Sequence, residues 1–193
     1  MCNLFKKHPD NKEPMATLPP GQKITTKLPI FSYGKTPLIS LNEWRLQIDG
    51  LVKTKKTLEW VNFLELPQTT VTADFHCVTR WSRLNNVWKG VLFKDVATLV
   101  KPLEQARFVI IHCYGGYLTN LPLNILLEKD VILATQLDGH DLHSDHGWPL
   151  RLIVPSRYGW KSAKWIAHLE FVQQDVPGFW ENRGYNNNAD PWK

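Results

Sequence analysis

The sequence predicts an α+β protein with a mainly β core of mixed sheets and short helices. Apolar and polar residues alternate in several short runs, which is typical of strands. Other runs have helical spacing, and the two kinds of element do not follow the strict βαβ order of a doubly wound sheet. At 193 residues the chain can bury one sizeable core, so we expect a single domain.

Local patterns predict each element in chain order. Residues 1–28 hold four prolines and few large apolar side chains, which predicts an extended N-terminal arm before a domain over 29–193. Alternation or β-branched apolar runs predict strands at 44–50, 71–76, 108–113, 131–135, 150–155 and 164–172. Helical spacing and end signals predict helices at 57–66, 93–99 and 122–127.

Composition limits the partners and the location. The net charge of +5 favours anionic partners in general, but the charges are dispersed, so we predict no nucleic-acid partner. Three cysteines without framework spacing do not indicate a disulfide-stapled secreted domain. No run reaches the roughly 18 apolar residues of a membrane span, and the N-terminus shows no export signal. We therefore expect a cytoplasmic protein without a membrane span.

The stretch 74–82 is the most informative part of the chain. It places Cys77 at the end of a predicted strand, close to the cationic Arg80 and to two hydroxyl side chains. Positive charge and hydrogen-bond donors favour a thiolate, and thiolates bind soft transition metals. Free cysteine is also a common core residue, so the residues alone leave a functional and a structural Cys77 both open.

A polar segment over 138–147 holds His140, His143 and His146 at three-residue spacing, with carboxylates nearby. Histidines with supporting carboxylates are typical of a zinc shell. The glycines of this segment indicate a loop, where such spacing does not place side chains on one face. A zinc site and solvated loop histidines are therefore both open.

Basic residues cluster after this loop. Arg151 stands at the mouth of an apolar strand, where a buried charge needs an anion or a carboxylate. Ser162 and Lys164 follow in the glycine-containing turn 158–165, and such turns form anion nests. An anion-binding site and an exposed basic hairpin both fit this pattern.

Four motifs in order resemble the sulfite oxidase family of molybdopterin enzymes, and more narrowly its small single-domain bacterial members. They are Phe75-His76-Cys77-Val78-Thr79-Arg80-Trp81-Ser82, Trp88-Lys89-Gly90, His146-Gly147-Trp148-Pro149-Leu150-Arg151 and Lys161-Ser162-Ala163-Lys164-Trp165. The resemblance runs from about Leu18 to Trp192. It implies the sulfite oxidase-type fold over 29–193, with molybdenum-molybdopterin as cofactor and no appended nucleotide.

The resemblance also implies roles for single residues. Cys77 matches the cysteine that donates its thiolate to molybdenum. Tyr185 resembles the tyrosine whose hydroxyl faces the metal centre, and Arg80 is the candidate that attracts an oxyanion. The residues that match cofactor-binding positions, where molybdopterin and its phosphate are held, are His76, His146, Arg151, Ser162 and Lys164.

The implied reaction moves an oxygen atom to or from a small sulfur-containing or anionic substrate, while molybdenum changes by two electrons. An external redox partner is expected, because the chain shows no haem, flavin or iron–sulfur motif. The region 31–35 contains no arginine, so reduction of S-oxides such as methionine sulfoxide is an alternative to sulfite oxidation. Two further functions stay open from the sequence, a zinc hydrolase built on the three loop histidines and a cofactor-free binding module.

Overall fold

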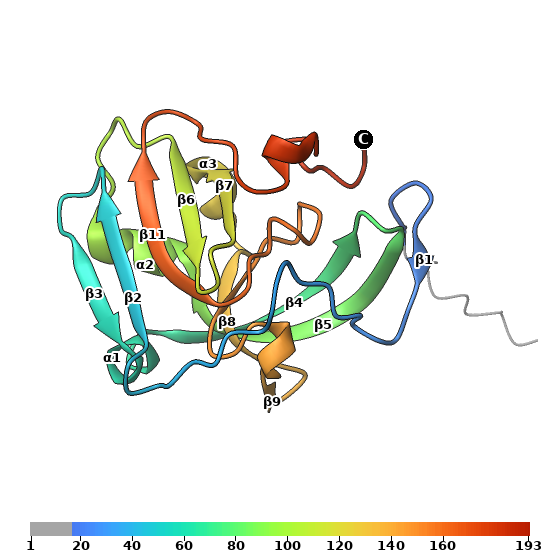
Figure 1. Ribbon diagram of the computed structural model, residues 1–193, viewed down its shortest axis with the longest axis horizontal. Helices are drawn as coiled ribbons and strands as arrows, with labels where there is room; N and C mark the ends of the chain where they lie inside the picture. The colour runs from blue at the N-terminus through green and yellow to red at the C-terminus, as the bar shows by residue number, and fades with distance from the viewer. Residues whose placement is uncertain (1–16) are drawn as a thin grey trace, which may run out of the picture.

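Two β-sheets form the framework of the computed structural model, which describes residues 17–193 (Figure 1). The first sheet consists of β1 (Lys23–Ile24), β4 (Gln68–Cys77), β5 (Trp81–Leu92), β8 (Ile132–Leu137), β9 (His140–Asp141) and β10 (Arg151–Ile153). The second consists of β2 (Arg45–Gly50), β3 (Lys56–Glu59), β6 (Phe108–Cys113), β7 (Leu118–Pro122) and β11 (Ile166–Val172).

The helices are short, and all but the last of them lie between strands. They are α1 (Trp60–Leu64), α2 (Phe93–Val100), α3 (Leu123–Leu126) and the 3₁₀ turns η1 (Ser144–His146) and η2 (Glu181–Arg183). No helix among residues 17–193 is both long and apolar enough to cross a membrane. The cytoplasmic location stays a prediction.

The long β4–β5 hairpin determines the shape of the first sheet. Its strands pair antiparallel from Gln68↔Val91 to Cys77↔Trp81, and Figure 1 shows the hairpin extending away from the second sheet. The strand β5 then pairs with β8, and β8 with β10. The two-residue strand β1 adds in parallel to the start of β5, next to the hairpin turn.

The second sheet has the order β3-β2-β11-β6-β7. The pair β11–β2 is parallel, whereas the other neighbours are antiparallel. The main core joins both sheets, because it combines buried side chains of β2, β6 and β11 with others from β5, β8 and β10. A smaller cluster includes Phe75 of β4 and Trp88 of β5, and Phe75 also lines the pocket described below.

The predicted α+β class with a mainly β core is confirmed. The strands expected at 44–50, 108–113, 131–135, 150–155 and 164–172 and the helices at 93–99 and 122–127 form with small changes at their ends. The strand expected at 71–76 forms as part of the longer β4. Part of the expected arm, residues 1–16 with Cys2, lies outside the described residues, and the division into arm and domain stays a prediction.

The helix predicted over 57–66 is wrong for its first half. Residues Lys56–Glu59 form β3, and only Trp60–Leu64 are helical. The cause is tertiary: Leu58 pairs with Leu46 across β2 and β3, and both side chains enter the core. Burial in a sheet therefore outweighs local helical spacing here.

Candidate functional site

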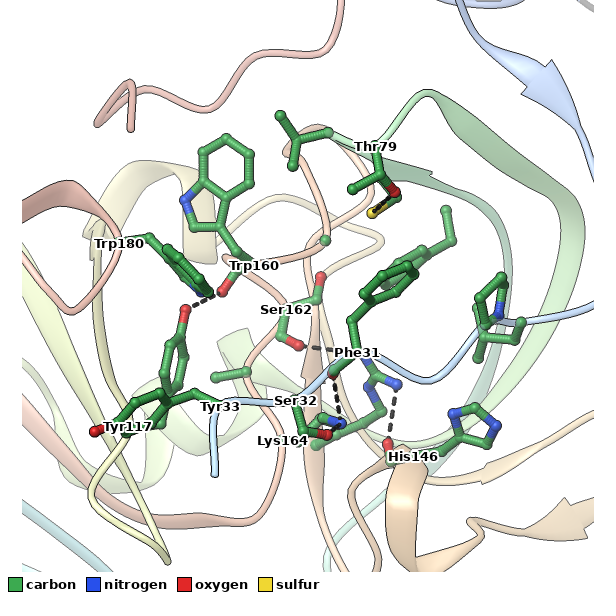
Figure 2. Close-up of a pocket in the computed structure, with 18 of the residues that line it drawn as sticks. Phe31, Ser32, Tyr33, Thr79, Tyr117, His146, Trp160, Ser162, Lys164 and Trp180 are labelled. Atoms are coloured by element: carbon green, nitrogen blue, oxygen red, sulfur yellow. Dashed lines mark hydrogen bonds between the residues drawn. The ribbon is translucent and has the colours of Figure 1, made fainter. Parts of the chain in front are cut away.

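A pocket of about 320 Å³ lies where five separate chain segments meet (Figure 2). Its walls come from the segment 28–33, the β4–β5 hairpin, Tyr117, the stretch 146–165 and the C-terminal residues 180–185. Of the eight residues to which the family resemblance gives a role, six line it: Cys77, His146, Arg151, Ser162, Lys164 and Tyr185. The other two, His76 and Arg80, lie outside the lining.

Cys77 is the last residue of β4 and is half-buried in the pocket wall. Its Sγ lies 3.1 Å from the Thr79 hydroxyl (Figure 2). A tight turn follows, in which the Arg80 N–H donates to the Cys77 carbonyl over 3.0 Å. Arg80 has a φ of +69° in this turn. Its side chain is exposed and lies outside the pocket lining, whereas Cys77 is part of the lining.

A series of side-chain hydrogen bonds holds the backbone carbonyl of Cys77. The Gln22 side chain donates to the Cys77 carbonyl over 3.0 Å and accepts from the Ser82 hydroxyl over 3.1 Å. The same hydroxyl lies 2.7 Å from Nδ1 of His76, which is buried. Burial lowers the pKa of His76, and its ring is held at the end of β4 by Ser82, outside the pocket lining.

The far end of the pocket is cationic. Arg151 is buried, and its guanidinium donates to the carbonyls of His146 (2.9 Å) and Ser162 (3.2 Å). Its Nε finds no partner among residues 17–193. The guanidinium also lies 5.4 Å from the ring centre of Phe75 and 5.4 Å from that of Trp88. Burial lowers the pKa of Arg151 to about 9, which still leaves the side chain charged at neutral pH.

Lys164 stands beside Arg151 in this region. Its Nζ donates to the carbonyls of Phe31 (2.9 Å) and Asp145 (2.7 Å) and to the Ser32 hydroxyl (Figure 2). Burial, followed by the positive charge of Arg151, lowers the pKa of Lys164 to about 8. Because the charge of Arg151 disfavours that of Lys164, a bound anion near both cations would be stabilised.

His146 lies in the positive electrostatic field of Arg151 and Lys164. Burial, and then the charges of Arg151 and Lys164, lower its pKa to about 4, so its imidazole is neutral at physiological pH. Gly147 follows with a φ of +112°, and a Cβ there would lie 2.9 Å from the Cβ of Arg151. The glycine therefore allows the loop to approach the cations closely.

The three loop histidines do not converge. His140 is exposed on β9, and the side chain of His143 is 66% exposed, whereas His146 lines the pocket. Among residues 17–193, no group of three or more histidine, cysteine, aspartate or glutamate side chains is placed to hold a metal ion by itself. The three-histidine zinc site that the sequence left open is therefore wrong.

Several lining residues were not foreseen. Trp160 and Trp180 form one wall, and the segment 28–33 crosses the cationic end. Trp81 lines the pocket beside Phe75, and its buried Nε1 finds no partner in the described part of the chain. The large number of tryptophans is the only signal in the sequence for these walls.

Comparison with known proteins assigns the family. Residues 33–180 match the family model described as oxidoreductase molybdopterin binding domain. The chain therefore belongs to this family, and it is a molybdenum-dependent oxidoreductase.

Individual relatives agree with this assignment. The chain is 41% identical to the uncharacterized oxidoreductase YuiH of Bacillus subtilis, over 91% of this chain and 89% of that protein. It is 30% identical to a putative protein-methionine-sulfoxide reductase subunit YedZ1 of Azospira oryzae, over 89% of this chain and 66% of that protein. The sulfane dehydrogenase SoxCD of Paracoccus pantotrophus has the same fold, with a TM-score of 0.67 and 22% identity over 73% of this chain and 41% of that one.

Proposed function

We propose that this chain transfers an oxygen atom to or from the sulfur of a small substrate, with molybdenum-molybdopterin bound in the pocket. The observation that carries this proposal is the presence of a half-buried thiol, the buried Arg151 and the half-buried Lys164 in one cavity, with aromatic walls around them. The proposed cofactor has no appended nucleotide. Electrons are exchanged with an external redox protein.

The residues of the pocket fit this cofactor. Cys77 would hold the metal through its thiolate. Arg151, Lys164 and the Ser162 hydroxyl would hold the phosphate, because no carboxylate among the described lining residues competes for the two cations. Arg151 Nε and Trp81 Nε1 are buried without a partner in the described part of the chain, at a cost of about 1–3 kcal/mol each, so these two lining residues are not fully satisfied by the protein itself.

When bound, molybdenum supplies the two-electron oxygen-transfer chemistry that side chains lack. The protein contributes orientation, exclusion of water and control of protons. Tyr185 lines the same pocket as Cys77, where its hydroxyl would hold a proton or a hydrogen bond near the substrate. The exposed Arg80 would attract anions from solution rather than contact them inside the pocket.

Reduction of a neutral S-oxide is a second candidate for the direction of the reaction. The described pocket lining holds Thr79, Val78 and several aromatic side chains besides Cys77, and its single arginine, Arg151, already donates to the His146 and Ser162 carbonyls. A site of this kind does not favour an anion such as sulfite near the thiol. The name of the Azospira oryzae relative is consistent with this candidate.

Metal analysis tests the proposal first. Protein made in a host that synthesises molybdopterin should contain nearly equimolar molybdenum and pterin without nucleotide. It should either oxidise sulfite with ferricyanide or reduce dimethyl sulfoxide with reduced viologen. Absence of both molybdenum and pterin despite adequate supply would refute the proposed function.

Substitution of Cys77 tests the metal ligand. Cys77→Ser should fold normally but lose activity and change the electronic spectrum of the bound metal. Cys113→Ala is the matched control, because Cys113 is buried outside the pocket lining and should tolerate the change. An active and spectrally normal Cys77→Ser protein would exclude Cys77 as the ligand.

A further inference from the structure

A buried ion pair lies directly behind one wall of the pocket. Lys161 Nζ and Glu181 Oε1 are 2.6 Å apart, and their side chains are only 1% and 2% exposed. The ammonium also donates to the Asn120 carbonyl (2.9 Å), the Asn120 side-chain oxygen (3.0 Å) and the Asn187 side-chain oxygen (3.2 Å). Neither Lys161 nor Glu181 is part of the pocket lining, so the pair does not contact a ligand there.

Each member of the pair is adjacent in sequence to a tryptophan of the wall. Trp160 precedes Lys161, and Trp180 precedes Glu181. Glu181 Oε1 accepts a hydrogen bond from Trp160 Nε1 over 3.1 Å. One carboxylate oxygen therefore joins the ammonium, the Trp160 indole and the η2 turn. Figure 2 shows Trp160 and Trp180 along the same side of the pocket.

The ring of Tyr185 packs against both tryptophans. Its ring centre lies 5.0 Å from that of Trp160 in a T-shaped arrangement and 4.8 Å from that of Trp180. Its N–H donates to the Trp180 carbonyl over 3.1 Å. The position of the Tyr185 hydroxyl therefore depends on where the two indoles are held.

Stability alone does not explain this pair. A buried ion pair gains little net free energy, because desolvation of both charges offsets their attraction, and apolar residues of similar volume often replace it without loss. Glu181 Oε2 finds no partner within residues 17–193, which adds to the cost. What the pair supplies, and apolar side chains would not, is a set of directional hydrogen bonds to the Trp160 indole and to Asn120.

We propose that Lys161 and Glu181 are positioning residues, which hold Trp160 and Trp180 and through them set the place of Tyr185 in the pocket. The proposal rests on the proposed function only for the chemical role of the Tyr185 hydroxyl. The contacts themselves belong to the protein without cofactor.

Hydrogen exchange of the cofactor-free protein tests the positioning directly. The double substitution Lys161→Met with Glu181→Met removes both charges together, since a single change would leave one buried charge unpaired. Amide exchange across 178–187 should rise at least tenfold, while exchange in β6 stays unchanged. Unchanged exchange across 178–187 would overturn the proposal, and so would an equal rise in β6, which would show a general loss of stability.

Two further variants complete this test. The exposed pair Arg45–Glu59 is the matched control, and changing both residues to Met should leave exchange across 178–187 unaltered. If the double variant of the buried pair does not fold, Trp160→Phe keeps an aromatic ring next to Tyr185 but removes the indole N–H that donates to Glu181. It should raise exchange in the same segment by a smaller factor, and no rise would overturn the proposal.

A double-mutant cycle with Tyr185→Phe tests the link to the reaction. In the cofactor-loaded enzyme, assayed with sulfite and with dimethyl sulfoxide, loss of the buried pair should lower kcat by up to about 100-fold, the order expected for a misplaced group. It should have no further effect when Tyr185 is already Phe. An additive effect would refute positioning through Tyr185, whereas a fully active Tyr185→Phe enzyme would refute the proposed role of Tyr185 and leave the exchange result to decide on the pair.

Discussion

Gly159→Ala would place a methyl group against the pocket wall. An ideal Cβ at Gly159 lies 2.6 Å from two ring carbons of Phe75, about 1 Å closer than a normal carbon–carbon contact. Phe75 is buried, with the rings of Trp81 (5.9 Å) and Trp88 (6.4 Å) and the guanidinium of Arg151 (5.4 Å) around it. The backbone has little room to adjust, because the Gly159 N–H donates to the His76 carbonyl over 2.8 Å.

The size of the effect follows from these contacts. Forcing one extra carbon into a packed site costs about 1–3 kcal/mol. Alanine offsets up to about 1 kcal/mol of this by restricting the unfolded chain, since Gly159 does not have a positive φ. We expect a net loss of about 1–2 kcal/mol, which for a chain of this size is a fall in Tm of about 2–8 °C.

Urea denaturation and thermal unfolding of the cofactor-free protein would measure this loss. The Phe75→Leu background is the control, because a smaller side chain there removes the clash, and Gly159→Ala should then cost little or nothing. A Tm that does not fall, or the same loss in both backgrounds, would refute the idea that Phe75 is held rigidly against Gly159.

Thiol reagents should label Cys77 in the native cofactor-free protein and leave Cys113 untouched, because burial raises the pKa of the Cys113 thiol; equal labelling by mass spectrometry would contradict this. Burial and a neighbouring positive charge lower the pKa of Lys164 to about 8, and a bound anion favours its charged form. Sulfate affinity, measured by calorimetry at constant ionic strength, should therefore be steady below about pH 8 and fall above it, and a flat profile across that range would exclude Lys164 from the anion site. Gln22→Ala removes two side-chain hydrogen bonds and should cost about 1–2 kcal/mol in urea denaturation, whereas the neighbouring Lys23→Ala should be neutral; equal effects would show that the Gln22 contacts contribute nothing.

The elements that were predicted best are those whose own residues show a mainly hydrophobic pattern. The strands at 108–113 and 164–172 consist mainly of apolar residues, with His112 in the first and His168 and Glu170 in the second as exceptions, and both lie in the second sheet. The twelve-residue strand β5 was not foreseen, because the polar pair Asn85-Asn86 interrupts its alternation. The Asn86 side chain is nevertheless satisfied there, since it donates to the carbonyls of Ala73 (2.9 Å) and Arg83 (2.7 Å).

The site was predictable only in part for a related reason. Local chemistry singled out Cys77, Arg151 and Lys164 one by one, but only the family resemblance indicated that they would meet. The support of Cys77 by Gln22 depends on β1 pairing with β5, and neither strand was predicted. The Lys161–Glu181 pair was missed because nothing near Lys161 in the sequence indicates a buried partner twenty positions later.

The five separate segments around the pocket also affect when the pocket can exist during synthesis. Both sheets are complete in sequence by Val172, so a nascent chain could pair all of its strands before Trp180 and Tyr185 emerge from the ribosome. One wall of the cavity would still be missing at that stage. A chain released early, beyond the last strand but short of Trp180, would therefore have its strands and lack a closed pocket. Quality control that recognises only exposed strand edges would not distinguish such a chain from the finished protein.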